Sequence, residues 1–206
     1  MSVLRIHGVS PSTFTRSVRM GCHEKGIAYE FVQARPGALG DLNPFEKIPV
    51  MTHGEFTLFE STAILRYLDR TFPGPKLWPD EVAPAAIVDQ WASVVCDSVL
   101  NSALRYIATR FNLLPVPAEM AERYLAKARQ VMAAIDRRLG ESRFLGGDRL
   151  SAADLLLAPP FAYFPDVPEM REIAEASPHC RRWAAEMAAR PSFIATEPEF
   201  KPQLAN

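Results

Sequence analysis

The chain has 206 residues, of which 48% are hydrophobic and 23% charged, a composition typical of an ordinary globular protein with one or two domains. Its 23 basic and 24 acidic residues leave a formal net charge of −1, which argues against a dedicated nucleic-acid-binding protein. No run approaches 18 apolar residues, so we expect no membrane span. The three cysteines, Cys22, Cys96 and Cys180, are too far apart for a disulfide framework and indicate a reducing, cytoplasmic compartment.

Residues 1–74 predict a small α/β domain. A short apolar strand at 3–7 is closed by Gly8, and an amphipathic helix follows that ends near Gly26. Residues 27–33 are rich in β-forming side chains and predict a second strand. A helix between two strands favours a βαβ unit, in which the two strands run parallel.

The rest of this domain predicts a hairpin and a second helix. After an irregular loop, two short apolar runs within 50–59 surround Gly54, which is typical of a β-hairpin. The helix expected over 60–72 places Ser61 at its N-cap, where a hydroxyl can accept a hydrogen bond from a free backbone N–H.

The chain then changes character. We predict a proline-rich linker at 75–84 and an all-helical domain over 85–206. Apolar residues at helical spacing indicate long helices over 85–111 and 118–140, the second stopped by Gly140.

A further helix has a strongly specified start. Ser151 and Asp154 stand at N-cap and N3 spacing, the pattern of a capping box. We interpret this pair as a folding and stability feature of the helical domain.

Several common catalytic and metal-binding patterns are missing from the sequence. The four histidines, His7, His23, His53 and His179, show neither helical pairing nor a CxxC companion, so we expect no metal site. The chain also has no Walker loop, no GxGxxG and no GxSxG motif.

Three stretches of the first domain are candidates for chemistry. Ser10, Ser12 and Thr13 precede a helix N-terminus, which favours anions, although such hydroxyls are usually caps. In "KIPV" (47–50), a turn at the proline would expose backbone groups that an extended peptide ligand could pair with. In "FESTAI" (59–64), a carboxylate and a cap hydroxyl stand side by side.

Together these stretches resemble motifs of the cytosolic glutathione transferases, of a bacterial, phi-like serine type. "NPFEKIPV", "LFESTAILRYL", "STFTR" and "LSAADLLLAP" are similar to four family segments and occur in the family's order along the whole chain. The resemblance implies a thioredoxin-like glutathione-binding domain, followed by a helical domain that contributes a hydrophobic acceptor site. It also implies a detoxifying enzyme that uses glutathione as co-substrate, without a metal.

Residue roles follow from the same resemblance. Pro49 corresponds to the family's cis-proline, and Ile48 would pair through its backbone with the cysteinyl part of glutathione. Glu60 and Ser61 would bind the γ-glutamyl end, and Lys47 would reach the glutathione backbone or its glycyl carboxylate. Residues 34–42 are short compared with the family and contain a single base, Arg35, which predicts weakened binding of that carboxylate.

The resemblance also indicates which hydroxyl activates the thiol. In the similar classes the catalytic position falls four residues after the glycine that closes the first strand. Ser12 is four residues after Gly8 and four before Arg16, whereas Ser10 is two after and six before. We therefore favour Ser12, with Ser10 and then Thr13 as the alternatives. The loop has no cysteine, which disfavours chemistry through a mixed disulfide.

The expected partners are glutathione, a small hydrophobic electrophile and a second copy of the chain, with no nucleic acid and no membrane. Phe14, Tyr106, Phe111 and Phe161 are candidates for the acceptor site, and Phe45 for an exposed aromatic that inserts into the other subunit. Two other functions stay open: a non-catalytic binding or interaction module of the transferase fold, and a glutathione-dependent cleaving, dehalogenating or isomerising enzyme.

Overall fold

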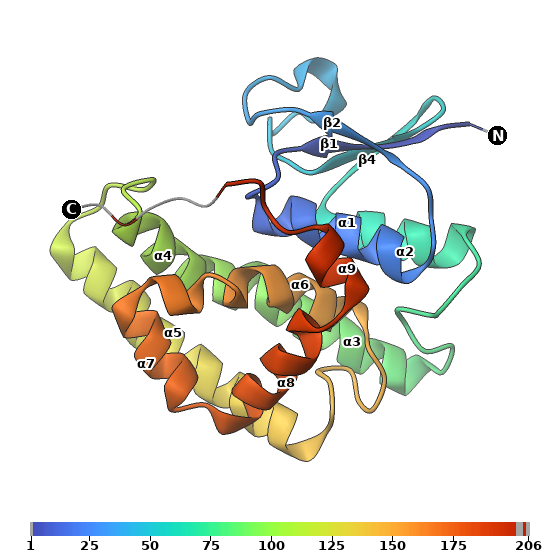
Figure 1. Ribbon diagram of the computed structural model, residues 1–206. Helices are drawn as coiled ribbons and strands as arrows, with labels where there is room; N and C mark the ends of the chain where they lie inside the picture. The colour runs from blue at the N-terminus through green and yellow to red at the C-terminus, as the bar shows by residue number, and fades with distance from the viewer. Residues whose placement is uncertain (1, 201–203, 205–206) are drawn as a thin grey trace.

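The computed structural model describes residues 2–200 and residue 204, and its first part is a four-stranded sheet packed on two helices (Figure 1). The elements of this part follow one another as β1 (Leu4–Gly8), α1 (Thr13–Glu24), β2 (Glu30–Gln33), a 3-10 turn η1 (Gly40–Leu42), β3 (Val50–His53), β4 (Phe56–Phe59) and α2 (Ser61–Thr71). The strand order is β2-β1-β3-β4. Strands β1 and β2 are parallel, and β3 pairs antiparallel with both β1 and β4, which confirms the predicted βαβ unit and hairpin.

The second part is helical, as predicted. Its elements are α3 (Val82–Val94), η2 (Val95–Leu104), α4 (Arg105–Arg110), α5 (Ala118–Glu141), α6 (Ala152–Phe161), η3 (Phe164–Asp166), α7 (Pro168–Glu175), α8 (Pro178–Ala188) and α9 (Pro191–Ala195). The stretch 85–111, predicted as one helix, is α3, η2 and α4 in unbroken succession, and η2 is a π-helix. In this wider helix, residues four to five apart share a face, which suits a continuous wall.

The linker is shorter than predicted, because α3 begins at Val82 inside the expected 75–84 stretch. Pro84 lies in the first turn of α3, where a helix tolerates proline since those N–H groups have no intrahelical partner.

A buried ion pair anchors the linker to the first domain. The Nζ of Lys25 donates to Asp69 at 3.2 Å and to the carbonyl of Pro75 at 3.1 Å. Asp69 also accepts from the backbone N–H groups of Leu77 and Trp78, at 2.8 and 3.3 Å. The buried carboxylate of Asp69 thus provides hydrogen-bond acceptors for backbone N–H groups of the linker, which has little regular structure of its own.

Gly140 does not end α5, contrary to the prediction, since the helix continues to Glu141. A Cβ at Gly140 would lie 3.0 Å from the ring of His179. Glycine at this position therefore allows the start of α8 to pack close to α5.

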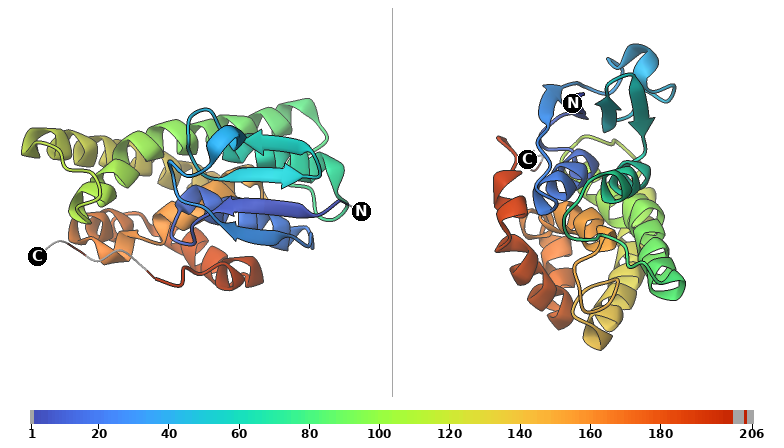
Figure 2. Two further views of the ribbon diagram at one scale, coloured as in Figure 1. Left: turned by 90° about the horizontal axis from the view of Figure 1, so that it is seen from above. Right: turned by 90° about the vertical axis from the view of Figure 1, so that its right-hand side faces the viewer.

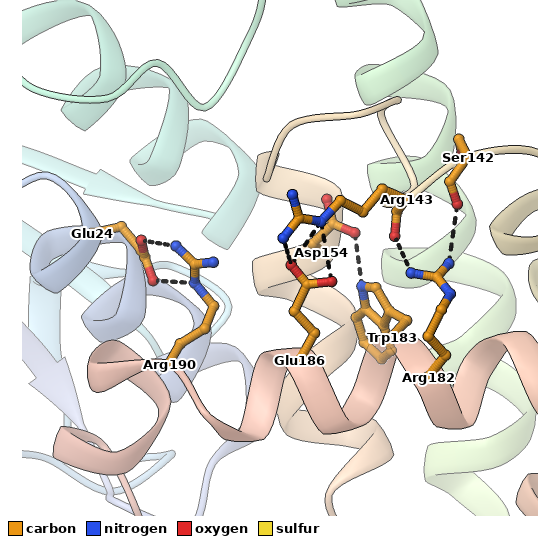
Figure 3. Close-up of polar contacts among 8 residues, drawn as sticks. All are labelled: Glu24, Ser142, Arg143, Asp154, Arg182, Trp183, Glu186 and Arg190. Carbon is orange, nitrogen blue, oxygen red and sulfur yellow. Dashed lines mark hydrogen bonds and ion pairs between the residues drawn. The ribbon is translucent and has the colours of Figure 1, made fainter.

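The predicted capping box is confirmed at the start of α6. Asp154 is fully buried and accepts four hydrogen bonds, from the N–H and hydroxyl of Ser151, the N–H of Leu145 and the indole N–H of Trp183. Figure 3 shows the bond from Trp183. Burial raises the pKa of this carboxyl group, and the four donors oppose that shift. Asp154 thereby joins α6 to α8 and to the loop before α6.

The C-terminal helices close around the rest of the chain. Arg190 binds Glu24 of α1 through two hydrogen bonds of 2.7 Å (Figure 3). Figures 1 and 2 show α1 and α2 between the sheet and the helical domain, and α1 packs on both α6 and α9. One hydrophobic core runs through both parts. Within residues 2–200 and 204, no helix is both long and apolar enough to cross a membrane.

Candidate functional site

The loop between β1 and α1 places its hydroxyls in different surroundings. Ser12 is the N-cap of α1, and its Oγ accepts from the N–H of Thr15 at 3.3 Å. Ser10 is 3% exposed, and its Oγ accepts from the N–H of Glu199 at 3.4 Å, so the C-terminal segment covers it. Thr13 is the first residue of α1 and stands beside Ser12 at the surface of a pocket.

The segment before β3 presents unpaired backbone groups. The Ile48–Pro49 peptide bond is cis, as the resemblance implies. Among the described residues, the N–H and C=O of Ile48 take part in no hydrogen bond. The side chain of Asn43 shapes this segment by donating to the carbonyl of Lys47 at 2.7 Å and accepting from the N–H of Phe45 at 3.0 Å.

Glu60 and Ser61 lie at the start of α2, whose N-cap is one residue earlier than the sequence predicts. Glu60 is the N-cap residue and has a positive φ of 69°, while Ser61 is the first residue of the helix and caps nothing. A non-glycine residue at positive φ is strained backbone, which occurs often at ligand sites. Ser61 is 6% exposed, and its hydroxyl bonds to no described residue. It lines the same cavity as Ile48, where both leave polar groups for a ligand.

We call the cavity that Ile48 and Ser61 line the polar cavity, the first of two hollows. It has a volume of about 510 Å³ and is bounded on the sheet side by Asn43, Lys47, Ile48, Pro49, Glu60 and Ser61. Its opposite wall comes from the helical domain, through Cys96, Leu100, Arg105, Ala108 and Leu114. Burial raises the pKa of the Cys96 thiol, with Thr62 as a weakly opposing hydrogen-bond partner, so this group stays protonated near neutral pH.

We call the second hollow the apolar pocket. It has a volume of about 300 Å³, and its mainly apolar lining includes Phe14, Leu100, Leu104, Ile107, Phe111 and Tyr163. Pro11, Ser12 and Thr13 line it as well. The polar cavity and the apolar pocket share Phe14, Leu100, Arg105 and Ala108, so the two hollows adjoin.

The predicted acceptor residues divide into two pairs. Phe14 and Phe111 line the apolar pocket, whereas Tyr106 and Phe161 lie outside both hollows. Tyr106 is 4% exposed, and burial together with the nearby Glu169 carboxylate raises its pKa to about 12. Phe161 stacks on Phe164 with ring centroids 4.6 Å apart, inside the core. Both were indicated by aromatic character alone, which does not distinguish a core face from a pocket face.

Most residues of the helical wall were not predicted from the sequence. Cys96, Leu100, Leu104 and Ala108 recur every four residues, a spacing that could have indicated one face of this helix. Asn43 was missed too, although its place in "NPF" marks a turn. Among the described residues, no group of three or more histidine, cysteine, aspartate or glutamate side chains is arranged to hold a metal ion.

The chain is similar in sequence to known proteins. The family models "Glutathione S-transferase, N-terminal domain" and "Glutathione S-transferase, C-terminal domain" match residues 6–76 and 118–186. Glutathione S-transferase F14 of Arabidopsis thaliana is 30% identical, over 84% of this chain and 75% of its own length. A glutathione S-transferase of Silene vulgaris is 30% identical, over 94% and 96%.

Solved structures agree with the fold. A glutathione S-transferase from Methylobacillus flagellatus, solved with glutathione bound, aligns with a TM-score of 0.83 at 25% identity, covering 95% of this chain and 99% of its own. The likeness confirms the predicted thioredoxin-like domain followed by a helical domain.

Proposed function

The chain belongs to the glutathione S-transferase family and is an enzyme of that kind; we propose that it activates the glutathione thiol through the hydroxyl of Ser12. The thiolate then attacks a hydrophobic electrophile or a peroxide held in the apolar pocket. We assign the chain to the phi-like serine type. Its bacterial origin stays a prediction, because the two curated relatives named above come from plants.

The proposed glutathione position follows the free polar groups of the polar cavity. The N–H and C=O of Ile48 would pair with the cysteinyl residue as an added strand does. The hydroxyl of Ser61 and the free N–H groups at the start of α2 would bind the γ-glutamyl carboxylate, and Glu60 its ammonium group. Lys47, which is exposed at the cavity, would take the glycyl carboxylate.

The proposed chemistry needs a thiolate at neutral pH, while a free thiol has a pKa of about 8.5. The Oγ of Ser12 already accepts a hydrogen bond from Thr15, which leaves its own proton free to donate to the sulfur. The positive end of the α1 dipole adds to this stabilisation. Both effects favour the charged form of the thiol and so lower its pKa.

The observation that carries the proposal is the contrast between the two serines. Ser12 lines the apolar pocket, which adjoins the polar cavity, so a sulfur beside it would face an acceptor. Ser10 is covered by the backbone of Glu199 and lines neither hollow. Thr13 remains the nearer alternative, because it lines the same pocket.

We also propose a homodimer. Phe45 is 63% exposed although it is a large apolar side chain, and it lies edge-on to Phe59 with ring centroids 5.9 Å apart. An exposed aromatic of this kind is suited to insertion into a second subunit.

The test compares Ser12→Ala with Ser10→Ala. We expect Ser12→Ala to lower kcat/KM towards 1-chloro-2,4-dinitrobenzene by about 10²-fold, as loss of a hydrogen bond to a reacting anion does. Its kinetic pKa should rise towards that of free glutathione. Loss of the cap should destabilise the fold by only about 1 kcal/mol, measured by denaturant unfolding.

The opposite pattern, with activity lost in Ser10→Ala alone, would move the role to Ser10. Calorimetry on the unmodified chain provides the further control: no heat of binding with millimolar glutathione would favour a non-catalytic binding module. A panel of peroxides, halogenated compounds and isomerisable substrates separates conjugation from the other glutathione-dependent reactions.

A further inference from the structure

One charged side chain belongs to both hollows. Arg105, the first residue of α4, lines the polar cavity and the apolar pocket, and in the described residues it is the only charged side chain of the apolar pocket. In Figure 1, α4 and the start of α1 lie on the same side of the molecule. An arginine in this place puts one positive charge beside a mainly apolar lining.

Neighbouring side chains orient the guanidinium group. The Nε of Arg105 donates to the Oδ1 of Asn101 at 3.0 Å, and Asn101 in turn donates to Asp97 at 3.0 Å. The guanidinium also lies 5.9 Å from the ring centroid of Tyr124. Among the described residues, its two terminal nitrogens make no hydrogen bond or ion pair. They therefore present a free fork, which matches the two oxygens of a carboxylate.

We propose that Arg105 binds a carboxylate carried by the acceptor substrate, so that the preferred acceptors are amphipathic electrophiles with an apolar body and one such group. This inference rests on the proposed function. The apolar body would lie against Phe14, Leu104 and Phe111, with the carboxylate at the pocket edge where the two hollows meet. Without the arginine, moving a carboxylate from water to this apolar surface would be unfavourable.

The charge balance favours the acceptor over glutathione as the ligand of Arg105. The polar cavity has Lys47 for the glycyl carboxylate, and the start of α2 for the γ-glutamyl carboxylate. The apolar pocket has no other charged group among the described residues. A carboxylate on the acceptor would therefore pair with Arg105 without displacing either carboxylate of glutathione.

A matched pair of electrophiles tests the inference: 4-chloro-3-nitrobenzoate and the neutral 4-chloro-3-nitrobenzamide. In both, the glutathione thiolate forms a bond to the carbon that bears chlorine, and chloride leaves with the bonding electrons. The measured quantity is the ratio of kcat/KM for the benzoate to kcat/KM for the benzamide, which cancels effects common to both substrates.

We expect Arg105→Gln to lower this ratio about tenfold, the effect of losing one charge-assisted contact. Arg105→Lys should restore part of it, since the charge remains without the fork. Arg110→Gln is the matched control: it removes the same charge from the same helix, but Arg110 pairs with Glu169 and lines neither hollow. Its ratio should stay within about twofold of the parent value.

An unchanged ratio in Arg105→Gln would overturn the inference. So would an equal loss with both electrophiles accompanied by a raised KM for glutathione, which would assign Arg105 to glutathione instead. Calorimetry with the unreactive pair 3-nitrobenzoate and 3-nitrobenzamide tests Arg105 without turnover, and equal loss of affinity for both would again overturn it. Absence of any turnover, with preserved selective binding of the benzoate, would contradict the proposed function and not this inference.

Discussion

The polar cavity and the apolar pocket adjoin, yet they are built in different ways. On its sheet side, the polar cavity is made largely of backbone and near-backbone groups at fixed turns of the chain: the segment at Ile48–Pro49 and the start of α2. The apolar pocket is made of side chains from α1, from η2 and α4, and from Tyr163, which are far apart in sequence.

The difference separates two kinds of recognition. Backbone groups at a turn cannot be altered by exchanging a side chain, which suits a co-substrate that stays the same between enzymes of one fold. Side chains on a helix face can be exchanged without disturbing the helix, which suits acceptors that vary between enzymes of one fold. Arg105 lies where the two kinds meet.

The largest effect is expected from a substitution that disrupts the polar cavity and the apolar pocket together. Asp154→Ala should lower the free energy of unfolding by about 3–5 kcal/mol, because it leaves buried donors of Ser151, Leu145 and Trp183 unpaired. Helix α6 packs on α1 and on η2, so both hollows depend on it. Urea unfolding measures the loss. Asp148→Ala, an exposed change in the loop before α6, should stay within about 0.5 kcal/mol of the parent, and an equally mild Asp154→Ala would contradict the prediction.

A smaller effect should separate the two regions. Ser61→Ala removes a hydroxyl of the polar cavity, and we expect the Kd for glutathione to rise about tenfold by calorimetry, since a hydrogen bond to a charged group is lost. KM for the electrophile at saturating glutathione should not change. Ser93→Ala, on the exposed side of α3, is the control. A parallel rise in both constants would mean that the two hollows are not independent.

The smallest effect concerns the contact that joins the regions. The hydroxyl of Tyr163 donates to the carbonyl of Pro11 at 2.9 Å and so holds the loop that carries Ser12. Burial raises the pKa of Tyr163, which keeps this donor protonated through the neutral range. Tyr163→Phe should lower the free energy of unfolding by about 1 kcal/mol and reduce kcat a few-fold, measured by urea unfolding and steady-state kinetics.

The control for this change is Tyr124→Phe, which removes a hydroxyl that bonds to no described residue. If both variants behaved alike, the contact with Pro11 would have no part in positioning the loop.

The sequence predicted the fold better than it predicted the pocket. The βαβ unit, the hairpin and the capping box at Ser151 and Asp154 all depend on local patterns, and the structure confirms them. Gly140 shows the limit: it resembles a helix stop, but its role is the close approach of His179 from a distant helix.

By itself, the sequence determined what short-range chemistry specifies: the order of the elements, the capping box at Ser151 and Asp154, and the stretches that carry Ile48, Pro49, Glu60 and Ser61. Tertiary structure alone decided which hydroxyl faces a pocket, because the cover over Ser10 comes from Glu199 at the other end of the chain. It also decided which side chains of η2 and α4 line the two hollows, since both hollows are bounded by residues of both domains. Tyr106 is turned into the core and Arg105 towards both hollows, although the two are adjacent in sequence.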